Sequence, residues 1–205
     1  MARRIVTEED VYKLPEGARL ELPEDAIVTD IAREWIQKKK IEVAPARSTE
    51  PRKRVRLAIG SDHAGFEMKE SLKEILAQMG ATFIDVGTHH KAPVDYPDFA
   101  HAVALSVCLG HAELGIVIDG AGIGSAMAAN KVPGVRAAAC YDEATARNAR
   151  EHNDANVLTL GARLISKETL AAVVKTFLAA SLNEERHRAR VDKIMEIERK
   201  YYRPV

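Results

Sequence analysis

Two polar runs of the chain have residue types that could move protons on a small hydroxylated ligand. Asp62 and His63 stand in the run Gly60–Gly65, directly after an apolar segment. A carboxylate and an imidazole placed there could handle protons and orient a hydroxylated ligand. Asp62 could also be a simple helix N-cap with no chemistry. In the other run, His152 could act as acid or base, and Asn153 could donate to an oxyanion. A helix C-terminus with solvated polar residues is the alternative there.

A glycine-rich run, Asp119–Ser125, follows the most apolar segment of the chain. Its alternating glycines would let the backbone approach a ligand, and the next helix would present free N–H groups to a phosphate or an enediolate. A dinucleotide site is not expected, because the spacing differs and no acidic residue ends a following strand. A tight strand-to-helix turn is the alternative. Asp119 argues against that alternative, since a carboxylate that ends a buried strand is costly unless it is used or paired.

Three arginines could hold a phosphate. Arg163 follows the last apolar segment, and Arg186 and Arg190 lie four residues apart, so a helix would place them on one face. Guanidinium geometry suits phosphate. An Arg- and Glu-rich helix can equally be a solvated surface.

These residues require a framework of alternating strands and helices. β-branched apolar runs predict strands at 55–59, 82–86, 114–118, 135–139 and 157–160, and helices are expected at 66–79, 98–109, 142–151, 167–180 and 184–201. This alternation predicts an α/β fold with a Rossmann-like, doubly wound parallel sheet and helices on both faces. Ligands bind at the carboxyl ends of such strands, where the polar runs are expected.

The chain divides into three regions. Residues 1–43 form a small extension, with a helix start at Thr7, a short strand around Leu20 and a helix from Thr29 to Lys40. Residues 44–53 contain two prolines without apolar periodicity and are interpreted as a linker. Residues 54–205 form the main domain. No internal repeat is apparent.

The bulk composition excludes several classes of protein. Lys+Arg and Asp+Glu both number 30, which does not favour nucleic-acid or membrane binding. No secretory signal or membrane span is evident, so a cytoplasmic location is expected. Cys108 and Cys140 are interpreted as buried, reduced thiols. No metal or cofactor is expected, because no compact Cys/His spacing occurs.

Taken together, these motifs resemble the ribose-5-phosphate isomerase B/galactose-6-phosphate isomerase family over roughly residues 54–203. The matching stretches are Gly60–Phe66, Asp95–Pro97, Gly120–Gly124, Ala128–Lys131, Glu151–Val157 and Arg186–Val191.

The resemblance implies a metal-free aldose–ketose isomerase that works through an enediolate, in a homodimer or tetramer whose sites use both subunits. Asp62 would hold sugar hydroxyls, and His152 would help to open the furanose ring. Asn153 and the backbone amides of Gly120, Ala121, Gly122, Ile123 and Gly124 would stabilise the enediolate. Tyr96 would line the pocket, and phosphate would be bound by His63, Arg163, Arg186 and Arg190.

The sequence departs from the family at two positions. Many members carry a cysteine base where this chain has Asp119, and a threonine where it has Ala121. Some members lack the cysteine and use a carboxylate at the position of Ile123, and an isoleucine cannot serve as a base. Asp119 is therefore the candidate base for ribose 5-phosphate isomerisation. A different substrate, such as a hexose 6-phosphate, and an inactive sugar-phosphate binder are the alternatives.

The extension, residues 1–43, is similar to short segments on enzymes of bacterial microcompartments. This resemblance implies an interaction with a shell or lumen partner and a location inside a microcompartment. The alternative is an extension that packs on its own subunit.

Overall fold

The computed structural model describes residues 5–22, 26–45 and 55–202. The chain forms two compact units, residues 1–53 and residues 54–205. No helix in the described part of the chain is long and apolar enough to cross a membrane.

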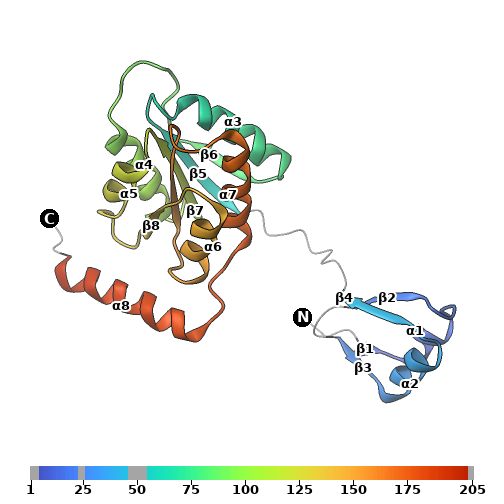
Figure 1. The fold of residues 1–205 in the computed structure, drawn as a ribbon. Helices are drawn as coiled ribbons and strands as arrows, with labels where there is room; N and C mark the ends of the chain where they lie inside the picture. Colours follow the sequence, from blue (N-terminus) through green and yellow to red (C-terminus); the bar gives the residue numbers. More distant parts are fainter. Residues whose placement is uncertain (1–4, 23–25, 46–54, 203–205) are drawn as a thin grey trace. The chain divides into compact units, whose positions relative to one another are not determined.

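The first unit consists of two β-α-β segments (Figure 1). The first segment contains β1 (Ile5–Val6), α1 (Glu8–Tyr12) and β2 (Arg19–Leu22), and the second contains β3 (Ile27–Val28), α2 (Asp30–Lys38) and β4 (Glu42–Pro45). The strands pair in parallel between the segments, β1 with β3 and β2 with β4. Five buried residues form the centre of its own core: Val6, Val11, Leu22, Ala32 and Ile41.

Two sequence interpretations of this unit are wrong. The two segments are an internal repeat, in which each helix follows the sequence Ile-Val-Thr and is capped by Thr7 or Thr29. This repeat is hard to see in the sequence because the two segments share little beyond the Ile-Val-Thr motif.

The linker was predicted to begin at residue 44, but Ala44 and Pro45 belong to β4 and align with Glu21 and Leu22. Proline is tolerated at such an edge position, where its missing N–H is not needed. The rest of the predicted linker, residues 46–53, lies outside the described residues.

The second unit is built on a five-stranded parallel sheet in the order β6-β5-β7-β9-β8. Its strands are β5 (Arg56–Ser61), β6 (Thr82–Asp85), β7 (Leu114–Asp119), β8 (Ala137–Ala139) and β9 (Val157–Gly161). The chain runs from β5 outward to β6 and then returns to β7 on the other side of β5. The strand order therefore reverses between β5 and β7, and parallel sheets bind ligands at such a point.

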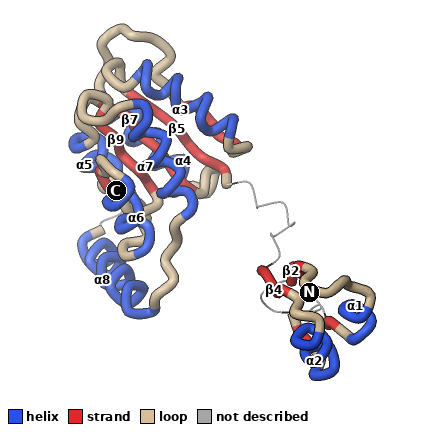
Figure 2. The backbone as a smooth tube through the Cα atoms, turned by 45° about the vertical axis from the view of Figure 1, so that its right-hand side comes forward, coloured by secondary structure: helices blue, strands red, loops and turns tan. Residues whose placement is uncertain are grey.

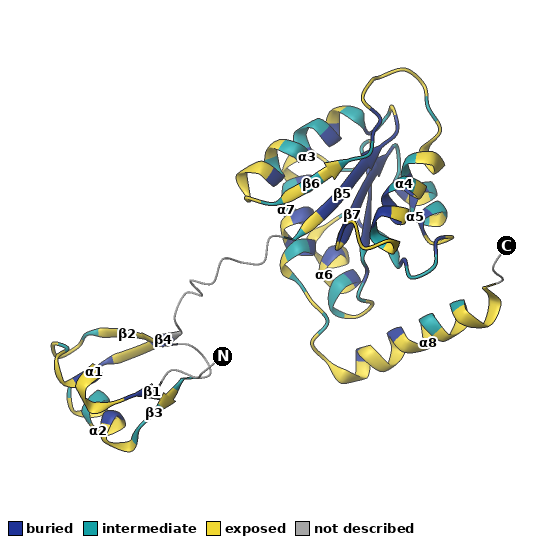
Figure 3. Ribbon diagram, turned by 180° about the vertical axis from the view of Figure 1, so that it is seen from behind, coloured by how far each residue is buried: buried dark blue, intermediate teal, exposed yellow. Residues whose placement is uncertain are grey.

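Helices cover both faces of this sheet (Figures 1 and 2). One face carries α3 (Phe66–Gln78), α6 (Glu143–Glu151) and α7 (Lys167–Ala179), and the other carries α4 (Tyr96–Cys108) and α5 (Ile123–Ala129). The last helix, α8 (Glu185–Tyr201), is largely exposed (Figure 3). Its C-terminal half contacts residues just before β8, since Glu198 accepts a hydrogen bond from the Gly134 N–H at 2.9 Å.

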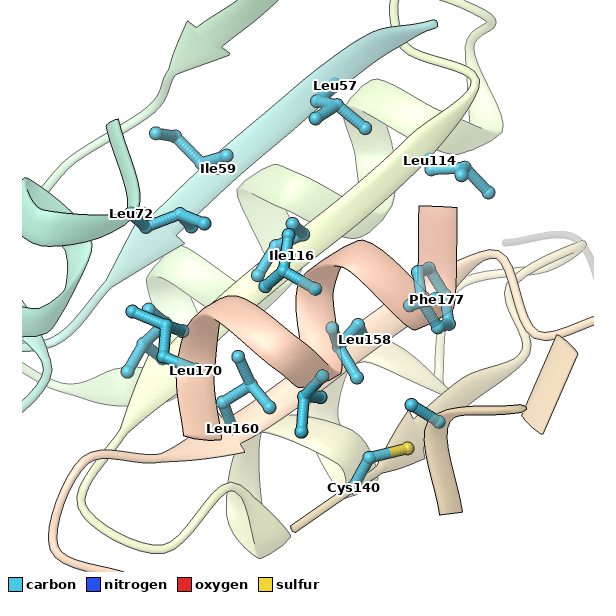
Figure 4. Close-up of a cluster of buried hydrophobic side chains, with 14 of the residues drawn as sticks. Leu57, Ile59, Leu72, Leu114, Ile116, Cys140, Leu158, Leu160, Leu170 and Phe177 are labelled. Atoms are coloured by element: carbon cyan, nitrogen blue, oxygen red, sulfur yellow. The ribbon is translucent and has the colours of Figure 1, made fainter. Parts of the chain in front are cut away.

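Alternating strand residues supply the two halves of the core. Ile116 and its neighbours pack with Leu72 and Phe177 on the α3–α7 side (Figure 4). Val117 packs with Val103 on the α4 side. Both faces of β7 are therefore closed, as expected for a central parallel strand.

The predicted doubly wound α/β fold is confirmed for this unit. Helix α4 begins at Tyr96, two residues before the predicted start, because Asp95 precedes it and Pro97 fits the first turn.

Cys140 is buried as expected, but Cys108 is exposed. The prediction for Cys108 is wrong because an apolar neighbourhood in sequence does not fix the helix face, and this residue ends α4 on its outer side.

Candidate active site

Asp62 follows β5 and has one side-chain oxygen engaged with the protein. Its Oδ1 accepts a hydrogen bond from the Gly65 N–H at 2.8 Å, and the side chain is buried. The Asp62 N–H donates to the Ile118 carbonyl at 3.2 Å, which ties the ends of β5 and β7 together. No described residue donates a hydrogen bond to Oδ2. Asp62 thus stabilises its turn through one oxygen and leaves the other available to a ligand hydroxyl.

Asp119 ends β7, is only 4% exposed, and is surrounded by donors. Its Oδ1 accepts from the N–H groups of Ala121, at 2.7 Å, and Gly122. Its Oδ2 accepts from the Ser125 N–H, at 3.1 Å, and from the Ser125 hydroxyl. A carboxylate offers about four lone-pair directions, so four donors occupy all of them. The resemblance assigned the N–H groups of Ala121 and Gly122 to an enediolate. In the structure both donate to Asp119 instead.

The glycine loop is fixed from several other elements. Gly122 has a φ of +80°, and a Cβ there would lie 2.9 Å from the Leu160 carbonyl carbon. The Thr159 hydroxyl donates to the Gly122 carbonyl at 2.7 Å, and the Tyr141 hydroxyl donates to the Ala121 carbonyl at 3.2 Å. Sequence reasoning missed both hydroxyls, because each is brought to the loop only by the packing of other strands.

Several predicted site residues gather around this loop. The Tyr96 ring covers Gly124, since a Cβ there would lie 2.6 Å from Tyr96 Cζ. Arg163 lies beside Gly120, to whose carbonyl its N–H donates at 3.1 Å. Ile123 is 49% exposed at the start of α5.

His63 lies on the loop side of β5, against the segment that leads into α4. Its Nδ1 is 3.1 Å from the Val94 carbonyl oxygen. We call the set Asp62, His63, Tyr96, Asp119–Gly124 and Arg163 the carboxyl-edge group.

A buried ion pair between Lys69 and Asp85 fixes the backbone next to the carboxyl-edge group. Lys69 is fully buried, and its Nζ lies 2.5 Å from Asp85 Oδ2. Burial alone would raise the pKa of Asp85, but hydrogen bonds from Lys69 and Lys73 bring that pKa below its ordinary value. Asp85 Oδ1 accepts from the Gly87 N–H at 3.0 Å, and the Gly87 carbonyl accepts from the Ser61 N–H at 2.7 Å. The pair therefore fixes the backbone next to Asp62.

The remaining predicted residues form a second group at the junction of α6 and α8. His152 is the C-cap of α6, and its Nδ1 lies 3.0 Å from the Asn148 side-chain nitrogen. The Asn153 side chain donates to Asn148 Oδ1 at 3.2 Å. Asn148 thus links two predicted catalytic residues, a role that sequence reasoning missed.

Arg186 and Arg190 enter this second group from the first turns of α8. The Arg186 Nε donates to Glu184 Oε2, and an Arg190 nitrogen lies 3.5 Å from His187 Nδ1. The His187 ring stacks on the His152 ring, with centroids 4.1 Å apart. We call His152, Asn153, Arg186, His187 and Arg190 the junction group.

The two groups lie at opposite edges of the sheet. Asp119 aligns with Gly161 at the carboxyl end of β9, whereas Asn153 precedes Val157 at the amino end of the same strand. Four residue steps separate these ends, or about 13 Å at a strand rise of ~3.3 Å. Figure 1 shows the same separation, with α8 along the lower edge and the loop after β6 at the upper edge. One chain does not bring all the predicted catalytic residues together.

Comparisons with known proteins place the chain among sugar-phosphate isomerases. Residues 57–194 match the family model described as Ribose/Galactose Isomerase. Ribose-5-phosphate isomerase B of Escherichia coli is 39% identical over 145 residues, which cover 71% of this chain and 97% of that protein.

Solved structures agree with this match. Ribose-5-phosphate isomerase B of Clostridium thermocellum is 48% identical with a TM-score of 0.70, covering 72% of this chain and 99% of that one. The enzyme of Mycoplasma genitalium, solved with bound ribulose 5-phosphate, is 41% identical with a TM-score of 0.68, covering 71% and 97%. The chain belongs to the Ribose/Galactose Isomerase family.

Proposed function

We propose that this protein interconverts an aldose phosphate and a ketose phosphate, with ribose 5-phosphate and ribulose 5-phosphate as the pair. The observation that carries the proposal is the carboxyl-edge group, in which Asp62 and Asp119 flank the strand-order reversal beside a glycine loop. The relatives named ribose-5-phosphate isomerase B support it. The reaction moves only protons between two carbons and two oxygens, and it requires no cofactor.

In this proposal each residue of the carboxyl-edge group has one role. Asp62 binds a sugar hydroxyl through its unpaired Oδ2, and Tyr96 lines the pocket over Gly124. His63 and Arg163 bind the phosphate. Backbone amides of Gly120, Ile123 and Gly124 remain to stabilise the enediolate, because those of Ala121 and Gly122 hold Asp119.

The junction group completes the site from a second subunit. His152 helps to open the furanose ring, Asn153 donates to the enediolate, and Arg186 and Arg190 bind the phosphate. We propose a shared site because the two groups lie at opposite edges of one sheet. Exposed apolar side chains on α5 and α8 support a homodimer: Met127, Ile194, Ile197 and Tyr201.

Asp119 is the proposed base that takes the proton from carbon 2. Because four donors occupy its lone pairs, one donor must leave before the carboxylate can accept that proton. The Ser125 hydroxyl can leave by rotating about one bond, without movement of the backbone. The proton then returns from Asp119 to carbon 1.

The test is proton NMR of the protein with ribose 5-phosphate in deuterated water. We expect ribulose 5-phosphate with deuterium at the exchanged carbon. Asp119→Asn should lower kcat on the order of 10²-fold or more, as removal of a general base does. Asp119→Cys, which installs the thiol of many family members, should retain turnover. Full activity of Asp119→Asn would show that Asp119 is not the base, and conversion of a hexose 6-phosphate alone would reassign the substrate.

A second candidate function is a sugar-phosphate binder that does not isomerise. The enclosed carboxylate of Asp119 favours it, since a group that only fixes its own loop would look the same. Such a protein would bind ribose 5-phosphate and the hexose phosphates without proton exchange. If Asp119→Cys exchanges the carbon-2 proton with solvent and the wild-type protein does not, this second function is supported.

For residues 1–43 we propose an interaction role with a microcompartment shell or lumen partner. The unit has a core of its own, lies outside the family match, and exposes Tyr12, Ile27, Ile31 and Val43. Deletion of residues 1–50 should leave sugar-phosphate binding intact and abolish co-sedimentation with assembled shells. Loss of soluble protein on deletion would instead mark the unit as structural.

A further inference from the structure

The side chain of His187 is buried at the α6–α8 junction without a hydrogen-bond partner for one ring nitrogen. The residue is 4% exposed, and its Nε2 has no partner among the described residues. The nearest anion, Glu184 Oε2, lies 3.6 Å from that nitrogen. Buried polar atoms are seldom left unpaired, so this placement requires a reason.

The reason is the contact between His187 and His152. The two rings are stacked with centroids 4.1 Å apart and planes 13° from parallel. His152 itself is exposed, so His187 covers one face of its ring and leaves the edge in solvent. The stack is also a direct contact between the end of α6 and the start of α8.

A second contact fixes which nitrogen of His152 carries the proton. The Asn148 amide oxygen accepts from Asn153, so the Asn148 nitrogen points to His152 Nδ1 as a donor. Nδ1 must then accept, and in the neutral ring the proton is on Nε2. The stack from His187 and this hydrogen bond together hold both the plane and the tautomer of His152.

We propose that His187 is a positioning residue for His152, holding its ring in place through a neutral imidazole stack. The proposal rests on the proposed function for its kinetic consequences only. His187 is held neutral first by its burial, because a buried imidazolium loses the hydration that stabilises its charge.

The charged groups around His187 agree with a neutral ring. Burial, then His152 and Arg186, lower the pKa of His187 below its ordinary value. Arg190 acts in the same direction, and Glu184 opposes it. Three neighbouring groups, His152, Arg186 and Arg190, therefore disfavour a positive charge on His187.

The experiment compares His187→Phe, which keeps a flat ring, with His187→Ala, which removes it, in the full chain. Lys193→Ala on an exposed turn of α8 is the matched control. Imidazole NMR would give the pKa and tautomer of His152, and steady-state kinetics with ribose 5-phosphate would give kcat and KM. We expect His187→Phe to keep the Nε2-protonated tautomer. His187→Ala should lose it and lower kcat about tenfold, with little change in KM, as loss of orientation does.

Three outcomes decide the proposal. An unchanged His152 tautomer and pKa in His187→Ala would overturn it. A kcat in His187→Phe as low as in His187→Ala, with a normal tautomer, would also overturn it, because the ring nitrogens would then act directly. If His187→Ala does not fold, the His187→Phe spectrum alone decides. The NMR readout does not depend on turnover, so a protein without isomerase activity would contradict the proposed function and still test the positioning role.

Discussion

The carboxyl-edge group and the junction group differ in how completely their polar atoms are paired. At the carboxyl edge, Asp119 accepts four hydrogen bonds, and Asp85 is paired with two lysines. At the junction, the buried Nε2 of His187 has no hydrogen-bond partner in the described part of the chain, and Asn153 and both arginines are exposed. The first group fixes Asp119 and its glycine loop within one chain and leaves Asp62 Oδ2 to a ligand, whereas the second presents exposed side-chain donors.

This difference indicates a division of labour. A loop held by four hydrogen bonds to Asp119 can keep its geometry when a charged ligand arrives, which suits the binding of an enediolate. A junction with exposed arginines can bind a ligand that another subunit holds. The following predictions test whether one edge is indeed rigid and the other adaptable.

The largest effect is expected for Lys69→Met at the rigid edge. Removing one partner of a buried pair leaves a poorly compensated charge on Asp85, and stability should fall by about 3 kcal/mol. Lys73→Met is the control, since its side chain is 28% exposed and should cost less than about 1 kcal/mol. Urea unfolding followed by far-UV circular dichroism measures both, because the only tryptophan, Trp35, belongs to the other unit. Equal losses would contradict the rigid-edge interpretation.

A smaller effect is expected for Ser125→Ala. The loss of one buried hydroxyl donor to Asp119 should cost about 1–2 kcal/mol, while Ser71→Ala at a half-buried position of α3 should change less. Removal of this donor also frees one lone pair of the Asp119 carboxylate, which can then accept a proton. The kcat for isomerisation should therefore be kept or increased, and a drop of about a hundredfold would show that the hydroxyl itself takes part.

The contribution of the junction group to folding stability should decrease in acid. This loss of stability should be smaller than those expected for the two substitutions above. A lowered pKa means that the folded state favours neutral His187, so its contribution is complete above the ordinary value of 6.5 and is lost as the pH falls through the lowered pKa. Melting temperatures of wild type and His187→Phe, compared between pH 7 and pH 5, measure this contribution. Parallel pH profiles for the two proteins would contradict it.

The smallest effect concerns the two thiols. Burial raises the pKa of Cys140 to about 11, so this thiol should stay protonated and unreactive at neutral pH, near the rigid edge. Cys108 is exposed and should react with a maleimide at once. Cys108→Ala should change stability by less than about 0.5 kcal/mol. Rapid labelling of two thiols per folded chain would show that the β8 end of the sheet opens.

The sequence predicted the large unit better than the small one for a physical reason. Leu114–Ile118 is uniformly apolar, and only a central strand buries such a run on both faces. This run was therefore enough to predict a parallel sheet covered by helices on both sides. β1 and β3 have two residues each, too few for any period to appear.

At the site, residue types were predictable but their partners were not. Asp119 stood out as a carboxylate at a buried position, yet its four donors depend on the conformation of the loop. Asn148 and Tyr141 gave no signal, because each acts on residues that only tertiary packing brings near.

The pairing of strands between repeats in the first unit has a consequence for its origin. Each two-stranded sheet takes one strand from each β-α-β segment, so neither segment can complete a sheet alone. Two separate copies of a single segment could form the same arrangement by exchange, with Thr7 and Thr29 as equivalent positions. The unit therefore has the architecture of a dimer of β-α-β segments joined in one chain.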